Sequence, residues 1–307
     1  MKKLICITAM LAIVFTGCGG GQTVRPDTQT ETAAAANADY STALISYLGP
    51  EGTYTQEACE VFFGKQGSCQ PCETVADAVE AMVSHKTDYA VIPQENTIGG
   101  AVIDYVDTVI AQTGVSVVGE VELPISQNLL VYPGTKLSDI RTVYSHKQGI
   151  AQGKDWLSEH LPDAELTEVS STAEGAKMVA EKKDVSCAAI ASAGCADVYG
   201  LELLYAGIQN NDKNKTRFYV LSAQSPAVNS AARLAFIASG TAGALPELLT
   251  QMKAQNMTLV TLHDRPLKTE LGEYNYLIEC TGSYQDYEKL AGTEGFTFRF
   301  LGCFDVK

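Results

Sequence analysis

Short apolar runs and amphipathic stretches alternate along the chain from residue 44 onward. The apolar run at residues 44–48 has the length of a strand, and a tight turn follows it at residues 49–52. Residues 74–84 instead place apolar side chains on one face at helical spacing, which predicts a helix. Further strands are predicted at residues 89–92, 115–121, 129–132, 142–144, 166–169, 188–190 and 218–221, and further helices at residues 53–63, 100–111, 147–160, 172–182 and 193–199. Such alternation over about 180 residues predicts an α/β fold, in which ligands bind at the carboxyl ends of strands.

The last part of the chain follows a linker rich in Ser, Ala and Pro at residues 223–231. Strands are predicted there at residues 234–238, 259–262, 274–279 and 296–304, with helices at residues 244–254 and 283–291. The order βαββαβ within about 75 residues is that of a ferredoxin-like unit. Residues 232–307 are therefore interpreted as a small regulatory or dimerising module.

Small hydroxyl and amide residues follow several of the predicted strands. They are Thr53, Asn96, Thr97, Ser145, Ser171 and Thr172. Thr53 and Ser171 each stand three residues before a Gln or Glu, the spacing of a capping box, so two helix N-termini are predicted beside strand ends. Free N–H groups at a helix N-terminus bind anions, although each hydroxyl taken singly is better explained as a helix cap.

The triplet Thr216-Arg217-Phe218 stands where a polar loop, residues 209–215, gives way to a predicted strand. A guanidinium fork could grip a planar carboxylate there, and a hydroxyl beside it could donate a proton. An ordinary solvated strand end has the same composition, so the spacing alone leaves the question open.

Length and charge bound the possible functions. The chain has 307 residues, of which 46% are hydrophobic, enough for one large or two ordinary domains with full cores. The formal net charge of −14 argues against nucleic-acid binding and against adsorption to anionic lipid. An anionic substrate would need a local positive site.

The N-terminus has the plan of a secretory leader, with two lysines, a short apolar stretch and small residues before Cys18. Residues 15–18 resemble the lipobox of bacterial lipoproteins. Residues 1–17 are thus predicted to be a signal peptide, Cys18 to be lipidated, and residues 18–43 to form a polar tether. The expected location is exported and membrane-anchored through lipid only; a cytoplasmic location is the alternative.

Two further motifs carry weaker signals. Cys69 and Cys72 form a CxxC in a predicted loop, where a local disulfide or simple loop cysteines are favoured over zinc or redox chemistry. His146 could act in acid–base chemistry, but a histidine at a strand end more often only hydrogen-bonds. The sequence has no HExxH and no phosphate-binding glycine loop.

Seven segments resemble motifs of prephenate dehydratases, in order and along nearly the whole chain. They are YLGPEGTYTQEA (47–58), IPQENTIGGAV (92–102), LPISQNLLVYPG (123–134), VYSHKQGIAQ (143–152), STAEGA (171–176), AAIAS (188–192) and IQNNDKNKTRFYVL (208–221). The family's Thr-Arg-Phe signature, whose threonine is required for dehydration, falls on Thr216 to Phe218. The resemblance implies two periplasmic-binding-protein-like α/β lobes around a cleft, one formed by residues 44–122 with 203–222 and the other by residues 123–202.

The resemblance also implies an activity. Prephenate would lose its ring hydroxyl and carbon dioxide to give phenylpyruvate, in phenylalanine biosynthesis, with no metal, nucleotide or redox cofactor. Thr216, helped by Asn96, would hydrogen-bond or protonate the leaving oxygen, and Arg217 would bind a carboxylate. The other substrate-binding residues implied are Thr53, Thr97, Ser145, Gln148, Ser171, Thr172 and Phe218.

The final unit resembles an ACT domain, whose Gly-Ala-Leu and Glu-Ser-Arg-Pro segments bind phenylalanine in this family. The corresponding residues are Gly243, Ala244, Leu245, His263, Asp264, Arg265 and Pro266. His263 and Asp264 replace Glu and Ser, so phenylalanine is expected to bind more weakly or differently. A homodimer or homotetramer is expected.

The chain also departs from the family. Gln127 stands where His is usual and Lys147 where Pro is usual, so the cleft is expected to be tuned differently. Arogenate dehydratase remains an alternative, as does a non-catalytic exported binding protein for an aromatic or carboxylate ligand. The intact triplet favours an enzyme, because a pure binder needs no proton donor.

Overall fold

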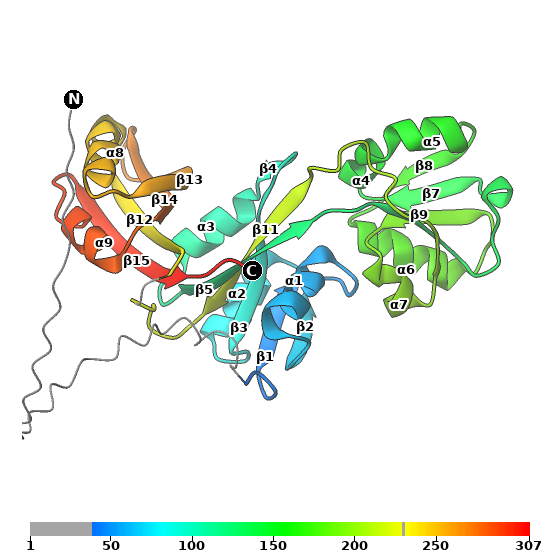
Figure 1. Ribbon diagram of the computed structural model, residues 1–307, viewed down its shortest axis with the longest axis horizontal. Helices are drawn as coiled ribbons and strands as arrows, with labels where there is room; N and C mark the ends of the chain where they lie inside the picture. Colours follow the sequence, from blue (N-terminus) through cyan, green and yellow to red (C-terminus); the bar gives the residue numbers. More distant parts are fainter. Residues whose placement is uncertain (1–38, 229–230) are drawn as a thin grey trace, which may run out of the picture. The chain divides into compact units, whose positions relative to one another are not determined.

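The computed structural model describes residues 39–228 and 231–307, which form three sheets with helices packed against each (Figure 1). The helices are α1 (Tyr54–Phe63), α2 (Val75–Val83), α3 (Ile103–Ala111), α4 (Lys147–Gln152), α5 (Lys154–His160), α6 (Thr172–Lys182), α7 (Gly194–Tyr199), α8 (Leu245–Ala254) and α9 (Tyr284–Leu290). The strands are β1 (Leu44–Leu48), β2 (Ser68–Cys72), β3 (Tyr89–Asn96), β4 (Gly100–Ala101), β5 (Ser116–Pro124), β6 (Asn128–Val131), β7 (Thr142–Ser145), β8 (Glu165–Glu168), β9 (Cys187–Ala191), β10 (Glu202–Tyr205), β11 (Lys215–Ser222), β12 (Arg233–Thr241), β13 (Thr258–Pro266), β14 (Glu273–Thr281) and β15 (Phe296–Phe304).

The first sheet has the order β2-β1-β3-β11-β5, with β4 paired to β3. Strand β11 lies antiparallel between β3 and β5, so the chain returns to this sheet after building the second one. Alternate side chains of each strand face opposite sides. Phe218 and Val220 pack with α1 on one side, whereas Tyr219 and Leu221 pack with α2 and α3 on the other. The first lobe is therefore a sheet with buried residues on both faces.

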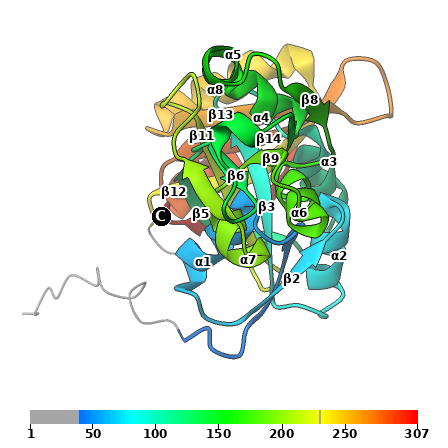
Figure 2. The same ribbon diagram turned by 90° about the vertical axis from the view of Figure 1, so that its right-hand side faces the viewer.

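The second sheet has the order β10-β6-β9-β7-β8, and Figures 1 and 2 show α5 and α6 on opposite sides of it. Leu129 and Val131 pack with Leu157 of α5, whereas Leu130 between them packs with Val179 of α6. The two α/β lobes predicted from the sequence are thus present. Within the described residues, no helix is both long enough and apolar enough to cross a membrane.

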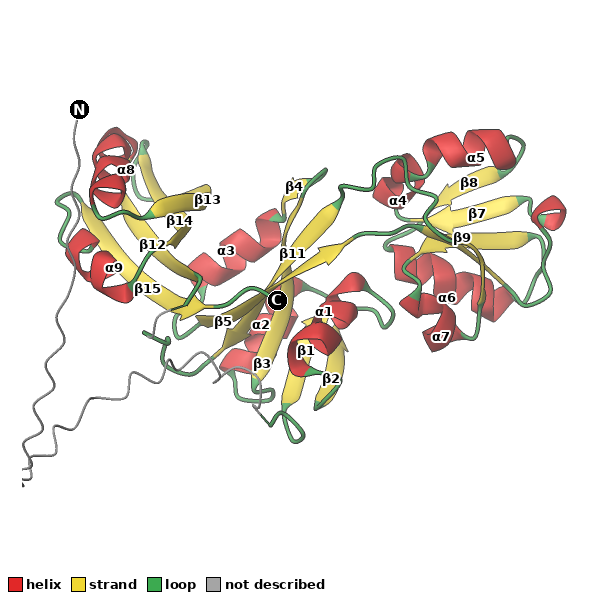
Figure 3. Ribbon diagram, viewed as in Figure 1, coloured by secondary structure: helices red, strands yellow, loops and turns green. Residues whose placement is uncertain are grey.

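The C-terminal unit has the predicted order βαββαβ and an antiparallel sheet ordered β13-β14-β12-β15. Its helices α8 and α9 cover one face, as the red helices beside the yellow strands in Figure 3 show. The other face packs on the first lobe: Ile237, Leu277 and Leu301 share one core with Tyr105 and Val117. The C-terminal unit is therefore joined to the lobe through apolar burial.

Several predicted elements differ from the structure. The CxxC lies on edge strand β2, not in a loop, and the structure holds Cys69 and Cys72 as free thiols. Three positions apart on a strand, they point to opposite faces, which contradicts a local disulfide. The helix predicted at residues 147–160 is two helices that meet at Gly153, and strand β10 was not predicted.

Two predictions concern the start of the folded part. Residues 39–43, the last of the predicted tether, are among the described residues, and there the Tyr40 ring packs edge-on against Phe63 with centroids 4.9 Å apart. The signal peptide, Cys18 and the rest of the tether lie outside the described residues. At α1 the predicted capping box is absent: the Thr53 hydroxyl donates to the Leu48 carbonyl instead of capping the helix.

Candidate active site

A cavity of about 290 Å³ opens between the two lobes. From the first lobe it is lined by Thr53, Tyr54, Thr55, Pro93, Asn96, Val102, Thr216 and Phe218. From the second lobe and the strands leading into it come Ile125, Gln127, His146, Gln148, Gly149, Gln152, Ser170, Ser171 and Thr172. The structure thus brings together Thr53, Asn96, Gln148, Ser171, Thr172, Thr216 and Phe218 from the predicted site.

Thr216 and Asn96 form the polar centre of this cavity. They face each other across the paired strands β11 and β3, and the Asn96 Nδ2 donates to the Thr216 Oγ1 at 2.9 Å. Because the amide donates to this oxygen, the Thr216 hydroxyl keeps its own proton for another acceptor. The Asn96 Oδ1 in turn accepts from the backbone N–H groups of Ile98 and Gly99, which fixes the orientation of the amide.

Polar contacts cross the cavity from one lobe to the other. Gln148 of α4 donates from Nε2 to the Asn96 Oδ1 at 3.3 Å, and the Tyr54 hydroxyl of α1 donates to the carbonyl of Ser126. Burial raises the pKa of Tyr54 well above its usual value, so this hydroxyl stays protonated as a donor. The lobes are therefore held around the Asn96–Thr216 pair.

Two helix N-termini supply the positive potential of the cavity. The first turn of α1 begins after Thr53, and α6 begins after Ser171, whose Oγ accepts from the Glu174 N–H at 3.0 Å. The first N–H groups of a helix have no partner inside the helix and favour an anion. Among the described residues that line the cavity, none is lysine or arginine. Carboxylates of a ligand would thus be bound by backbone N–H groups and hydroxyls.

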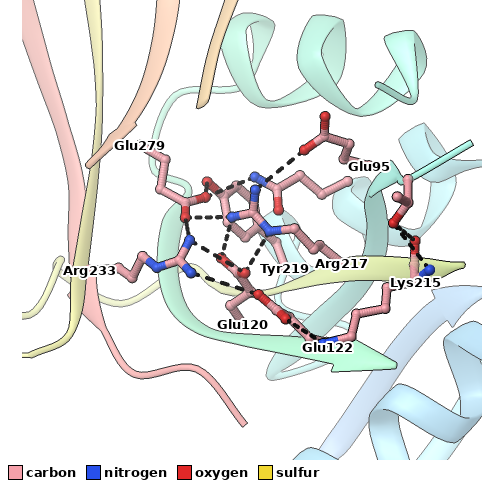
Figure 4. A network of polar contacts seen from close by, with 10 residues as sticks. Glu95, Glu120, Glu122, Lys215, Arg217, Tyr219, Arg233 and Glu279 are labelled. Carbon is pink, nitrogen blue, oxygen red and sulfur yellow. Dashed lines mark hydrogen bonds and ion pairs between the residues drawn. The ribbon is translucent and has the colours of Figure 1, made fainter. Parts of the chain in front are cut away.

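Arg217 does not line the cavity, which corrects the prediction that it binds a substrate carboxylate. Residues alternate along β11, so Thr216 and Phe218 face the cavity and Arg217 faces the opposite side. There its guanidinium makes a bidentate pair with Glu120, at 2.7 and 2.8 Å, and pairs with Glu279 (Figure 4). The fork is occupied by carboxylates of the protein.

Burial disfavours the charged form of both carboxyl groups of this cluster, but their pKa values shift in opposite directions. It raises the pKa of Glu120 to about 7, although the Arg217 guanidinium favours the charged form. Burial opposes ionisation of Glu279 as well, but Arg217 and the hydrogen bond from Gln94 outweigh it, and the pKa of Glu279 is lowered. Of the two carboxyl groups that pair with Arg217, Glu279 is therefore the one that ionises at the lower pH.

Thr97 and Ser145 also lie outside the cavity lining. The Thr97 hydroxyl donates to the backbone carbonyl of Lys215, where it fastens the end of β3 to β11. Ser145 is fully buried and donates to the Ile190 carbonyl at 2.7 Å. A Cβ on Gly149 would lie 2.5 Å from the Ser145 Oγ, so helix α4 covers this hydroxyl. Both hydroxyls therefore have structural contacts instead of a place in the cavity.

The predicted effector residues lie in two groups of the C-terminal unit. Gly243, Ala244 and Leu245 lead into α8, and open space lies beside Gly243. His263 to Pro266 form the end of β13. On that strand the His263 ring packs against Tyr105 of α3, at 6.0 Å between centroids, and Arg265 pairs with Asp107 of α3. Burial lowers the pKa of His263, which favours the neutral form of its ring.

Sequence reasoning missed two sets of functional candidates. Gln127 was noted only as a departure from the family, yet it lines the cavity, donates to Gln152, and has a buried Oε1 without a partner among the described residues. Glu120 and Glu279 were missed because their partner Arg217 was placed in the cavity. The alternation of side chains along β11 was the signal that could have found them.

The fold and this cavity define a class: a two-lobed α/β protein whose cleft presents a hydroxyl held by an amide between two helix N-termini. Comparison with known proteins makes the class specific. Residues 45–226 match the family model described as prephenate dehydratase. The bifunctional chorismate mutase/prephenate dehydratase of Neisseria gonorrhoeae is 36% identical over 244 residues, which cover 79% of this chain and 67% of that protein.

Two further similarities agree. The prephenate dehydratase of Lactococcus lactis is 30% identical over 275 residues, covering 85% of this chain and 97% of that protein. The crystal structure of a prephenate dehydratase from Arthrobacter aurescens in complex with L-Phe is similar with a TM-score of 0.78 and 28% identity, covering 85% of this chain and 90% of that one. The chain belongs to the prephenate dehydratase family, and the enzyme class predicted from the sequence, a lyase of this family, is confirmed.

Proposed function

We propose that this chain converts prephenate to phenylpyruvate, with Thr216 as the group that protonates the departing hydroxyl. The observation that carries the proposal is the Asn96 amide donating to the Thr216 oxygen at 2.9 Å inside the inter-lobe cavity. An oxygen that already accepts from an amide directs its own O–H toward another acceptor, here the leaving oxygen. This reaction is a step of phenylalanine biosynthesis.

The reaction balances with one proton. The ring carboxylate leaves as carbon dioxide, its bonding electrons enter the ring, and the ring hydroxyl leaves as water once it is protonated. Thr216 then regains a proton from solvent. The product ring is aromatic, so the protein needs mainly to orient the dianion, and the N-termini of α1 and α6 at Thr53 and Ser171 are suited to its carboxylates.

The test is turnover of prephenate by the purified protein without any added cofactor. Formation of phenylpyruvate, followed by absorbance, is the expected result. Arogenate is assayed beside it, and a larger kcat/KM for arogenate would assign the chain to arogenate dehydration. Tight binding of prephenate without turnover would instead support a non-catalytic binding protein.

We also propose that the C-terminal unit is an ACT domain that binds phenylalanine, and that the protein is a homodimer or homotetramer. The Arthrobacter aurescens relative was crystallised with L-Phe, and the free space beside Gly243 leaves room for a ligand at the start of α8. Phenylalanine is expected to inhibit turnover, and the inhibitory concentration should change less between about pH 6 and pH 8 than it would beside an exposed histidine, because burial lowers the pKa of His263. Calorimetric titration without any heat of binding would refute the effector site.

Finally, we propose that residues 1–17 are a signal peptide and that the protein is held at the outer face of the membrane through a lipid on Cys18. The support is the order of charged, apolar and small residues before Cys18, followed by a polar tether that leads to the folded unit. We keep the division into lobes at residues 44–122 with 203–222 and 123–202, a linker at 223–231 and the ACT domain at 232–307. Fractionation of wild type and Cys18→Ser tests the anchor; wild type recovered in the cytoplasm with Met1 intact would refute it.

A further inference from the structure

The pairing of β3 with β11 slips by one residue beside the cavity. It passes from Glu95 to Pro93 and leaves Gln94 as an extra residue, a β-bulge. In a regular strand, a Pro93 on the cavity face would place Asn96 on the opposite face. The bulge returns Asn96 to the cavity, which both Pro93 and Asn96 line. The orientation of the Asn96 amide toward the cavity therefore depends on this bulge.

Both bulged residues are held from the side that faces the C-terminal unit. Gln94 is fully buried, and its Nε2 donates to the Oε2 of Glu279 on β14 at 2.9 Å. The Glu95 carboxylate lies 3.4 Å from the Arg217 Nη1, and Arg217 is itself paired with Glu279 (Figure 4). One carboxylate of the C-terminal sheet thus reaches both residues of the bulge, directly or through one partner.

The Glu279 carboxylate is fully engaged by the first lobe and by β12. Its Oε2 also accepts from the Tyr219 hydroxyl at 2.8 Å, and its Oε1 accepts from Arg217 and Arg233. The side chain is 1% exposed, so water cannot replace these partners. Arg217 and Tyr219 belong to β11, the strand that carries Thr216.

We propose that Glu279 is a positioning residue for the Asn96–Thr216 pair. It does not line the cavity; it holds the bulge of β3 and the back of β11, and so sets the donor geometry of the two residues that face the substrate. The proposal rests on the dehydratase function proposed above. A displacement of about 1 Å at a reacting group lowers rates by up to about 100-fold.

The first test is Glu279→Gln, which keeps the size of the side chain but replaces one acceptor oxygen by a donor. We expect kcat for prephenate to fall by about 10- to 100-fold with KM changed less than about threefold, because the cavity lining is intact. Glu279→Asp, which keeps the charge, should recover part of kcat. The matched control is Asp107→Asn, which breaks a different ion pair between the C-terminal unit and the first lobe, Asp107 with Arg265, and should leave kcat unchanged.

A double-mutant cycle separates positioning from a general loss of folded protein. In a Thr216→Val background the hydroxyl to be positioned is gone, so Glu279→Gln should lower the residual kcat by less than about threefold. A loss of folded protein would multiply both backgrounds by the same factor. Equal losses in the two backgrounds, or a Glu279→Gln variant with kcat within about threefold of wild type, would overturn the proposal.

Hydrogen exchange provides a reading that needs no turnover. Amides of β3 and β11 should exchange faster in Glu279→Gln than in wild type, and at the wild-type rate in Asp107→Asn. Unchanged exchange in β3 of Glu279→Gln would count against the proposal. If wild type fails to turn over prephenate, the proposed function is wrong, but this exchange measurement still decides whether Glu279 holds the strands.

Discussion

The Asn96 side-chain amide donates a hydrogen bond of 2.9 Å to the Thr216 hydroxyl oxygen, across two strands that are 120 residues apart in sequence. The oxygen of the same amide, Asn96 Oδ1, accepts from the Gln148 Nε2 of the other lobe at 3.3 Å. One side chain therefore orients the proposed acid and also forms a hydrogen bond between the two lobes. This double role makes Asn96 a sharper probe of the mechanism than a residue that only lines the cavity.

Asn96→Asp replaces the amide donor by a carboxylate acceptor of the same size. The Thr216 proton would then be held by the carboxylate, so it is less available to the leaving hydroxyl. We expect kcat to fall by about 100- to 1,000-fold above the pH at which this carboxylate ionises, which is within the range of a lost general acid. Activity of Asn96→Asp measured from acid to neutral pH checks this, and a variant as active as wild type at neutral pH would contradict the pairing.

Arg217→Met should act on stability, because the Arg217 guanidinium binds Glu120 and Glu279 instead of substrate. Removing one partner of a buried ion pair lowers the free energy of unfolding by about 3–5 kcal/mol. Chemical denaturation measures this directly. A stable Arg217→Met protein with only a large rise in KM would restore the carboxylate-binding role that the sequence suggested.

Glu120 gives the stability of the protein a particular dependence on pH. Burial raises the pKa of Glu120 to about 7, above that of the unfolded chain, in the presence of Arg217, Arg233 and Glu279. A raised carboxyl pKa means that the folded state binds the extra proton, so this contribution is full at low pH and is lost as the pH rises through about 7. Between about pH 5 and pH 8, wild type should lose free energy of unfolding relative to Glu120→Gln. Parallel curves for the two proteins would show that Glu120 does not titrate in this range.

Gln127 lines the cavity and carries a side-chain oxygen that can accept a hydrogen bond. Its Oε1 is buried and unpaired within the described part of the chain, while its Nε2 donates to Gln152 at 2.9 Å. A donor group of the substrate would satisfy this oxygen. Gln127→Met keeps the volume but removes the acceptor, and KM should rise about tenfold, the value of roughly one hydrogen bond. An unchanged KM for both prephenate and arogenate would exclude a contact between Gln127 and the substrate.

The sequence predicted most of the fold because its signals are local. Gly64 and Gly200 end α1 and α7 in the left-handed conformation, as expected from their positions after apolar helical patterns. The element order of the C-terminal unit followed from the same kind of pattern. Strand β2 was missed because Pro71 and two cysteines conceal a strand, and it lies at the edge of its sheet, where Pro is tolerated.

The site was predicted only in part, for a geometric reason. Motif resemblance named Thr216 and Asn96, which the structure brings together, but it placed Arg217 beside them because Arg217 is adjacent to Thr216 in sequence. Adjacent residues of a strand face opposite sides. The bulge at Gln94 and its contact with Glu279 join residues 185 apart in sequence, and no local pattern reports such a contact.

The most direct test of the account compares wild type with Thr216→Val, which removes the hydroxyl and keeps the shape of the side chain. The account predicts that wild type forms phenylpyruvate from prephenate, and that Thr216→Val lowers kcat by about 100- to 10,000-fold while KM changes little, as for a lost proton donor. Circular dichroism and the denaturation midpoint should match those of wild type. A folded Thr216→Val protein with the wild-type kcat would contradict the account, because the proton would then come from another group.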